Sequence, residues 1–138
     1  MPPEVVAVLE TGLYVDDMRR ALEFYDRLFG FPKMFGDDRL CAYNVSGRSV
    51  LLLFRKKGTL EPMQMPGGIL PPHDGDGQQH MAFSITSEAW DDWMRKLGEM
   101  AIAVESVVNW DAGGRSVYFR DPDGNLLELA TPGIWPIY

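Results

Sequence analysis

Residues 9–31 read LETGLYVDDMRRALEFYDRLFGF, and this stretch contains the signals for a strand, a turn and a helix in that order. The β-branched and apolar run 5–15 is typical of a strand, and Asp16 and Asp17 then offer an N-cap with favourable charge for a helix. Apolar residues recur at three- and four-residue spacing, as in a helix, at Met18, Ala21, Leu22, Tyr25, Leu28 and Phe29. Gly30 stands where a left-handed C-terminal cap belongs. The stretch predicts a strand followed directly by an amphipathic helix.

Three short strands are predicted after this helix, at residues 31–36, 40–45 and 50–55, and the turn 46–48 joins the last two as a hairpin. Together with the opening strand and helix they form a βαβββ module. Residues 56–79 then carry many prolines and glycines among few periodic apolar residues, so they read as a linker. A connection of this length is often a functional loop or a mobile joint between modules.

The second half of the chain repeats the first. A strand is predicted at 80–85, a helix start at 86–88, and strands at 101–108, 116–120 and 126–130. The second helical stripe consists of Trp90, Trp93, Met94 and Leu97, which lie 72 positions after apolar residues 18, 21, 22 and 25 of the first helix. Gly98 follows this stripe. Although any two amphipathic helices can be slid into register, duplication explains the match economically. We expect one α+β domain over 1–138, with modules at about 5–55 and 80–133 joined by a linker at 56–79.

Composition excludes several classes of protein. The chain has 138 residues, of which 46% are apolar and 24% are charged, as in an ordinary globular domain rather than a disordered one. The net charge of −7 and the scattered basic residues argue against nucleic acid, and no apolar run approaches a membrane span. Nothing marks the N-terminus for export, so a cytoplasmic location is expected. The single cysteine, Cys41, lies in an apolar run and is expected to be buried.

The opening stretch, together with SVYFRDPDGNLLELATP at residues 116–132, resembles the vicinal oxygen chelate superfamily of glyoxalases, bleomycin resistance proteins and extradiol dioxygenases. The resemblance implies two βαβββ modules paired into a curved mixed sheet around a small-molecule site. Within the closing hairpin, the tetrad 121–124 reads as a tight turn in which Pro122 presets φ and Gly124 supplies a positive φ. We therefore assign Asp121 and Asp123 a structural role.

The same resemblance implies metal ligands at Glu10, His80 and Glu128, and strand alternation places each of them away from the more apolar face of its strand. The family's position on the fourth strand falls near Leu52 or Leu53, neither of which can ligate. Most metal-binding relatives carry His or Gln where Glu10 stands. One histidine with two carboxylates favours Mn²⁺, Fe²⁺ or Mg²⁺, with Zn²⁺ or Ni²⁺ as alternatives. The alternative is that these residues have no metal-binding role, with Glu10 and Glu128 as solvated strand residues and His80 as a hydrogen-bonded histidine at the start of a strand.

The function that this resemblance implies is a divalent-metal-dependent lyase, isomerase or dioxygenase, acting on a small substrate chelated through vicinal oxygens. Glu128 and Glu10 would be catalytic by moving a proton, while Tyr14 and His73 would bind substrate. For Tyr14 and His73 the alternatives are simple packing and an exposed loop histidine.

Two rival functions remain open at this point. One is a metal-free protein of the bleomycin resistance type that sequesters a cationic or aromatic ligand, and the other is a noncatalytic dimerisation module. A homodimer is expected from the long linker and from the resemblance, because modules of family members pair either within a chain or across subunits. The apolar ending GIWPIY, residues 133–138, would cover the pocket mouth or a partner subunit, or dock on its own sheet.

Overall fold

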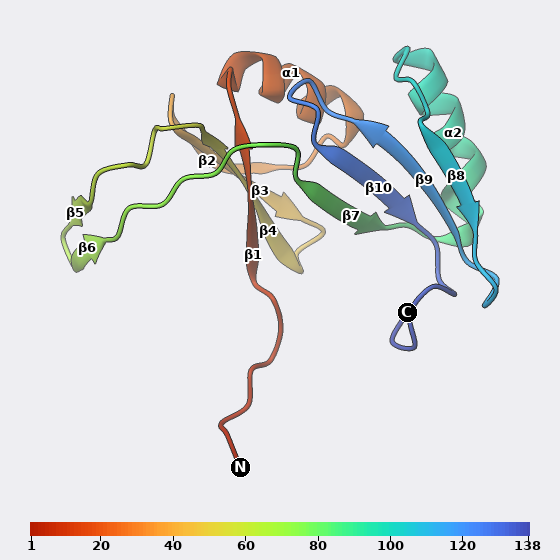
Figure 1. The fold of residues 1–138 in the computed structure, drawn as a ribbon, viewed down its shortest axis with the longest axis horizontal. Helices are drawn as coiled ribbons and strands as arrows, with labels where there is room; N and C mark the ends of the chain where they lie inside the picture. The colour runs from red at the N-terminus through yellow and green to blue at the C-terminus, as the bar shows by residue number, and fades with distance from the viewer. The chain divides into compact units, whose positions relative to one another are not determined.

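In the computed structural model, which describes residues 1–138, strand β1 (Glu10–Val15) leads directly into helix α1 (Met18–Leu28) (Figure 1). The Asp17 carboxylate caps the helix by accepting a hydrogen bond of 3.2 Å from the backbone N–H of Arg20. At the other end, Gly30 adopts a φ of +63° and its N–H donates to the carbonyl of Asp26. Both predicted ends of this helix are confirmed.

The first sheet contains β1 with β2 (Lys33–Gly36), β3 (Leu40–Val45) and β4 (Ser49–Arg55), in the order β1-β4-β3-β2. β1 runs parallel to β4, and the other pairs are antiparallel. One face of this sheet forms a core with α1, made of Leu13, Val15, Ala21, Tyr25, Leu28, Cys41, Tyr43, Leu51 and Leu53. The other face of β1 carries Glu10, Gly12 and Tyr14, as the alternation predicted.

The second sheet repeats this arrangement strand for strand. It contains β7 (His80–Ser84), β8 (Ser106–Asn109), β9 (Arg115–Arg120) and β10 (Leu126–Ala130), in the order β7-β10-β9-β8. The short 3₁₀ turn η1 (Ser87–Ala89) leads into helix α2 (Trp90–Glu99). The chain divides into two compact units, Met1–Asp76 and Gly77–Tyr138, each with one helix and one mixed sheet. The predicted α+β class and the βαβββ repeat are confirmed.

The opening strand is shorter than the apolar run predicted. Pairing starts at Glu10, because β4 begins at Ser49 and the last backbone bond before the paired residues runs from Val50 N–H to the Leu9 carbonyl, at 2.9 Å. Residues 1–8 have no strand beside them, and the apolar side chains of Met1, Val5, Val6 and Val8 are exposed, as is that of Leu9. Figure 1 shows this segment leading away from β1. The prediction of a strand over 5–15 was wrong for its first half.

The linker contains a hairpin that the sequence pattern did not reveal. Strands β5 (Met63–Met65) and β6 (Gly68–Leu70) pair antiparallel within residues 56–79, and the hairpin projects from the rest of the first unit in Figure 1. Each strand has only three residues, which is too short for an alternating pattern to be recognised. Several of its apolar side chains are exposed, among them Met65, Ile69 and Leu70.

The end of the second helix also differs from the prediction. α2 continues through Gly98 to Glu99, and the left-handed φ of +54° falls on Ala101 instead. The following strand is correspondingly later, since β8 begins at Ser106 rather than at residue 101. The tight turn at 121–124 is confirmed, with Gly124 at a φ of +82° and the Asp121 carboxylate accepting bonds from the N–H groups of Asp123 and Asn125.

The chain's end docks on its own unit at both ends of residues 133–138, and at the first of these the N–H of Gly114 donates to the Gly133 carbonyl at 3.1 Å. The Tyr138 hydroxyl donates to the Ile85 carbonyl at 2.8 Å, whereas Trp135 and Ile137 remain exposed. Cys41 is buried, as predicted. None of the helices has the length and apolar character needed to cross a membrane.

Candidate functional site

Two of the three predicted metal ligands meet on the second sheet. β7 and β10 run side by side in parallel, with His80 opposite Leu126 and Glu128 two residues further along. His80 Nε2 lies 3.3 Å from Glu128 Oε1. The imidazole is half-exposed, whereas the glutamate side chain is only 10% exposed. The pair lies on the face away from buried Leu127 and Leu129, as the alternation predicted.

A hydrogen bond from the His80 ring to a backbone carbonyl shows which ring nitrogen carries hydrogen. His80 Nδ1 lies 2.9 Å from the carbonyl oxygen of Leu126, which can only accept, so Nδ1 must be the donor. In the neutral ring Nε2 then presents a lone pair to a carboxylate oxygen of Glu128. Two acceptors facing each other at 3.3 Å repel unless a cation lies between them, either a proton on Nε2 or a metal ion.

The donor set fits a divalent metal ion. Imidazole nitrogen and carboxylate oxygen bind such ions at about 2.0–2.2 Å, so two neighbouring ligands lie roughly 3–3.4 Å apart. The separation of 3.3 Å between His80 Nε2 and Glu128 Oε1 falls in this range. Metal-binding histidines also typically donate their second ring N–H to a backbone carbonyl, as His80 does to Leu126. Within neither unit do three His, Cys, Asp or Glu side chains gather as one ligand group.

Two residues that sequence reasoning missed hold the glutamate in place. The Ser116 hydroxyl donates to Glu128 Oε2 at 2.5 Å and accepts a hydrogen bond of 2.9 Å from Trp110 Nε1. Because an indole N–H can only donate, the hydroxyl hydrogen of Ser116 is directed at the carboxylate. Ser116 is fully buried, and Glu128 is 7% exposed as a residue. Strand alternation could have placed Ser116 on this face, but only the register of β9 on β10 brings it to Glu128.

Tyr118 adds a second aromatic group beside this network. It pairs with Glu128 across β9 and β10, and its ring centroid lies 6.3 Å from that of His80. Burial raises the pKa of the Tyr118 phenol, and the negative charge of Glu128 raises it further. Tyr118 therefore stays a neutral phenol beside the carboxylate.

Glu10 lies in the first unit, at the beginning of β1, where its side chain is exposed. It is opposite Val50 on β4 and shares its face with Gly12 and Tyr14. Its neighbours on β4 at this face are apolar. Of Leu52 and Leu53, the two residues expected near the family's position on this strand, Leu52 lies on this face, and it has no ligating group. Glu10 as a ligand remains a prediction.

The two residues predicted to bind substrate lie together on the same face of the first unit. The hydroxyl of Tyr14 lies 2.6 Å from His73 Nδ1, and the two rings meet edge to face with centroids 5.9 Å apart. The linker therefore brings His73 back onto the open face of its own sheet. Their role with a substrate remains a prediction.

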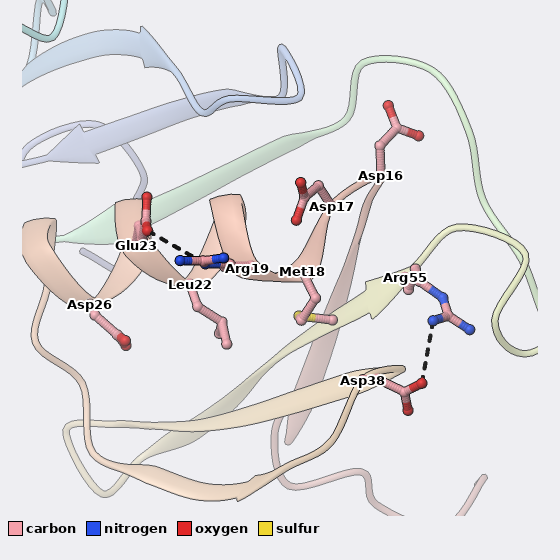
Figure 2. Close-up of a pocket in the computed structure, with 9 residues that line it drawn as sticks. All are labelled: Asp16, Asp17, Met18, Arg19, Leu22, Glu23, Asp26, Asp38 and Arg55. Carbon is pink, nitrogen blue, oxygen red and sulfur yellow. Dashed lines mark hydrogen bonds and ion pairs between the residues drawn. The ribbon is translucent and has the colours of Figure 1, made fainter.

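A separate hollow of about 780 Å³ lies on the helix side of the first unit, lined by Asp16, Asp17, Met18, Arg19, Leu22, Glu23, Asp26, Asp38 and Arg55 (Figure 2). Its carboxylates are already engaged: Asp38 pairs with Arg55 at 3.5 Å, and Asp17 caps α1. Asp26 pairs with Lys33 at 2.7 Å. This hollow contains none of the candidate residues, and within the first unit Glu10 and Tyr14 lie on the opposite face of the sheet.

Comparison with known proteins identifies the family of the chain and several relatives. The family model of the Glyoxalase/Bleomycin resistance protein/Dioxygenase superfamily matches residues 7–129. Metallothiol transferase FosB of Staphylococcus epidermidis is 28% identical over 131 residues, covering 93% of this chain and 83% of that protein. FosB of Bacillus licheniformis is 25% identical over 122 residues, covering 88% and 72%.

Solved structures show the same likeness across the whole chain. The crystal structure of lactoylglutathione lyase from Agrobacterium tumefaciens is 32% identical, covers 99% of both chains and superposes with a TM-score of 0.85. Two sheets of identical strand order, a matching family model and this structural likeness support one conclusion. The chain belongs to the Glyoxalase/Bleomycin resistance protein/Dioxygenase superfamily.

Proposed function

We propose that the protein is a divalent-metal-dependent enzyme acting on a small substrate that presents two neighbouring oxygens. The observation that carries this proposal is the pair His80 Nε2 and Glu128 Oε1, two acceptors held 3.3 Å apart by backbone and side-chain hydrogen bonds. A pair of this kind is stable when a cation is shared between its members. The names of the relatives, a metallothiol transferase and a lactoylglutathione lyase, favour transfer or lyase chemistry over oxygenation.

The protein's own residues would divide the work as follows. His80 and Glu128 hold the ion, with Glu10 as the third ligand, and Mn²⁺, Fe²⁺ or Mg²⁺ suits this oxygen-rich set. When bound, such an ion supplies Lewis acidity to the substrate oxygens. Ser116 keeps Glu128 oriented, which leaves Glu10 as the carboxylate better able to take up and return a substrate proton. Tyr14 and His73 contact the substrate, and the protein works as a homodimer.

Thermal unfolding with and without metal tests this function. EDTA-treated protein should melt at a higher temperature as Mn²⁺ or Fe²⁺ is added, because an ion that binds only the folded state stabilises it. His80→Ala should abolish the shift. Glu10→Gln keeps the side-chain shape but removes the charge, so the affinity for Mn²⁺ should fall by about tenfold or more, as for a loss of about 1.4 kcal/mol.

Glu4→Gln is the matched control, since Glu4 is an exposed glutamate in the N-terminal segment and should leave the metal response unchanged. If neither ion changes the melting temperature and no metal copurifies, the metal-free sequestering protein becomes the better interpretation. If Glu10→Gln binds Mn²⁺ as the wild type does while His80→Ala does not, Glu10 is removed from the ligand set.

A further inference from the structure

An aromatic layer covers the open face of the first sheet beyond Glu10. The Phe54 ring lies 5.6 Å from the Tyr14 ring and 4.5 Å from the His73 ring, measured between centroids. Gly12 makes room for this layer, because a Cβ at that position would lie 2.9 Å from Phe54 Cε2. β1 and β4 therefore present Tyr14 and Phe54 as a platform on which the His73 ring rests edge-on.

The loop that carries His73 is fastened from both sides. The backbone N–H of His73 donates to the Thr59 carbonyl at 3.0 Å, and the Thr59 hydroxyl donates to the His73 carbonyl. The next residue, Asp74, accepts a bond of 2.9 Å from the N–H of Lys57. Gly75 passes so close to the Tyr14 ring that a Cβ there would overlap it. The position of the imidazole is thus set by the backbone of its own loop.

The hydrogen bond with Tyr14 also bears on the form of the imidazole. Burial raises the pKa of the Tyr14 phenol, and the negative charge of Asp74 raises it further, so the hydroxyl keeps its proton and can donate it to His73 Nδ1, 2.6 Å away. With the hydroxyl as donor, His73 Nδ1 is the acceptor, and the single hydrogen of the neutral ring lies on Nε2. Nε2 makes no hydrogen bond within the chain, and His73 is exposed.

We infer that Tyr14 holds His73 as a fixed hydrogen-bond donor whose Nε2–H binds an acceptor oxygen of the substrate. This inference rests on the proposed function, because it assigns the open face of the first sheet to substrate. A ring held by its loop, by two aromatic neighbours and by a hydrogen bond presents its remaining donor at little further cost in conformational freedom. The ligand class is a small molecule with a carbonyl-type or anionic oxygen.

The form of His73 is tested first, in the full-length protein without metal. The chain has only two histidines, so long-range ¹H–¹⁵N spectra of the wild type and of His73→Gln assign both rings. At mildly alkaline pH, His73 should carry its hydrogen on Nε2 alone, and Tyr14→Phe should admit the Nδ1–H form. A wild-type His73 with hydrogen on Nδ1, or with a mixture unaffected by Tyr14→Phe, would overturn the inference.

Binding is tested with acetohydroxamate, a neutral probe with two neighbouring oxygens, on protein loaded with Mn²⁺. His73→Leu should weaken probe binding by about five- to tenfold, the effect of one lost neutral hydrogen bond. The amide N–H of His73→Gln reaches the same place, so the affinity of this variant for acetohydroxamate should lie within about twofold of the wild-type affinity. Mn²⁺ affinity should be equal in all three proteins. Equal probe affinity in wild type and His73→Leu would overturn the inference.

A matched pair of glycines in the same linker tests the role of the loop. Gly75→Ala should displace the loop from Tyr14 and lower the affinity for acetohydroxamate as His73→Leu does. Gly67 has open space around it, so Gly67→Ala should bind acetohydroxamate with the affinity of the wild type. Equal binding by the two alanine variants would count against the fastened loop. Failure of Mn²⁺ to bind the wild type would instead contradict the proposed function and leave the tautomer result standing, so the two failures are distinguishable.

Discussion

Ser116 illustrates how one neutral side chain can fix a charged one. Its hydroxyl accepts from Trp110 and donates to Glu128, and it is fully buried, so neither bond can be replaced readily by water. The orientation of Glu128 therefore depends on a residue that has no ligating role of its own. Groups of this kind commonly matter almost as much for metal affinity as the ligands they hold.

Ser116→Ala should lower the affinity for Mn²⁺ by about tenfold, since Glu128 loses the donor that orients Oε2. Titration of Mn²⁺ followed by electron paramagnetic resonance measures this directly. Ser84→Ala is the control, because Ser84 is exposed on β7 and forms no bond to the glutamate. Equal Mn²⁺ affinity in wild type and Ser116→Ala would show that β9 merely supports the sheet.

At the scale of elements, the two helices end differently although the sequence suggests one pattern. Gly30 follows α1 at a φ of +63°, a conformation that side chains with a Cβ adopt at a cost. Gly98 instead lies within the last turn of α2, with nothing within 4 Å of an added Cβ. Glycine therefore stabilises the fold at position 30 relative to alanine and destabilises it at position 98.

Alanine substitutions should separate these two glycines by the sign of their effect. Gly98→Ala should raise the free energy of unfolding by about 0.5–1 kcal/mol, the difference in helix propensity between the two residues. Gly30→Ala should lower it by about 1–2 kcal/mol, the cost of the left-handed conformation. Urea unfolding followed by circular dichroism measures both. Destabilisation by Gly98→Ala would mean that the second helix ends at Gly98, as its sequence suggested.

At the scale of the whole molecule, stability should depend on alkaline pH through Tyr43. This side chain is fully buried, and its hydroxyl donates to Asp26 Oδ1 at 2.7 Å. Burial, and next the bond to Asp26, raise the pKa of the Tyr43 phenol far above its ordinary value of 10.0. The unfolded chain loses this proton near pH 10, whereas the folded protein retains it.

The folded state therefore binds more protons than the unfolded state above pH 10, and its stability should fall as pH rises. The contribution of Tyr43 to the free energy of unfolding is fully present below pH 10. Above pH 10 this contribution decreases by up to about 1.4 kcal/mol per pH unit. Urea unfolding of wild type and Tyr43→Phe across this range measures the effect. The wild type should lose stability more steeply than Tyr43→Phe, and parallel curves would contradict the assignment.

The proposed homodimer also belongs to this scale. Val5, Val6, Val8 and Leu9 are between 68% and 92% exposed, and Trp135 and Ile137 are 71% and 95% exposed, so both ends of the chain carry uncovered apolar side chains. Analytical ultracentrifugation at micromolar concentration should show a dimer. Removing residues 1–8 should weaken association if the N-terminal segment contributes to the interface, and a monomer in the wild type would rule out an obligate dimer.

The sequence by itself determined the features that depend on neighbouring residues. The cap at Asp17, the stripe of α1, the turn at Gly124 and the alternation that places His80 and Glu128 on open faces all follow from local spacing. The duplicated order of elements was readable for the same reason. Where apolar character alone was used, as in residues 5–9, the prediction failed because a strand also needs a partner beside it.

Only the tertiary structure decided which of these residues meet. The parallel pairing of β7 with β10 brings His80 to Glu128, and the register of β9 delivers Ser116 from twelve positions earlier in the chain. The return of the linker places His73 on Tyr14, 59 positions away. Strand register and loop closure depend on contacts between residues distant in sequence, which no local periodicity encodes.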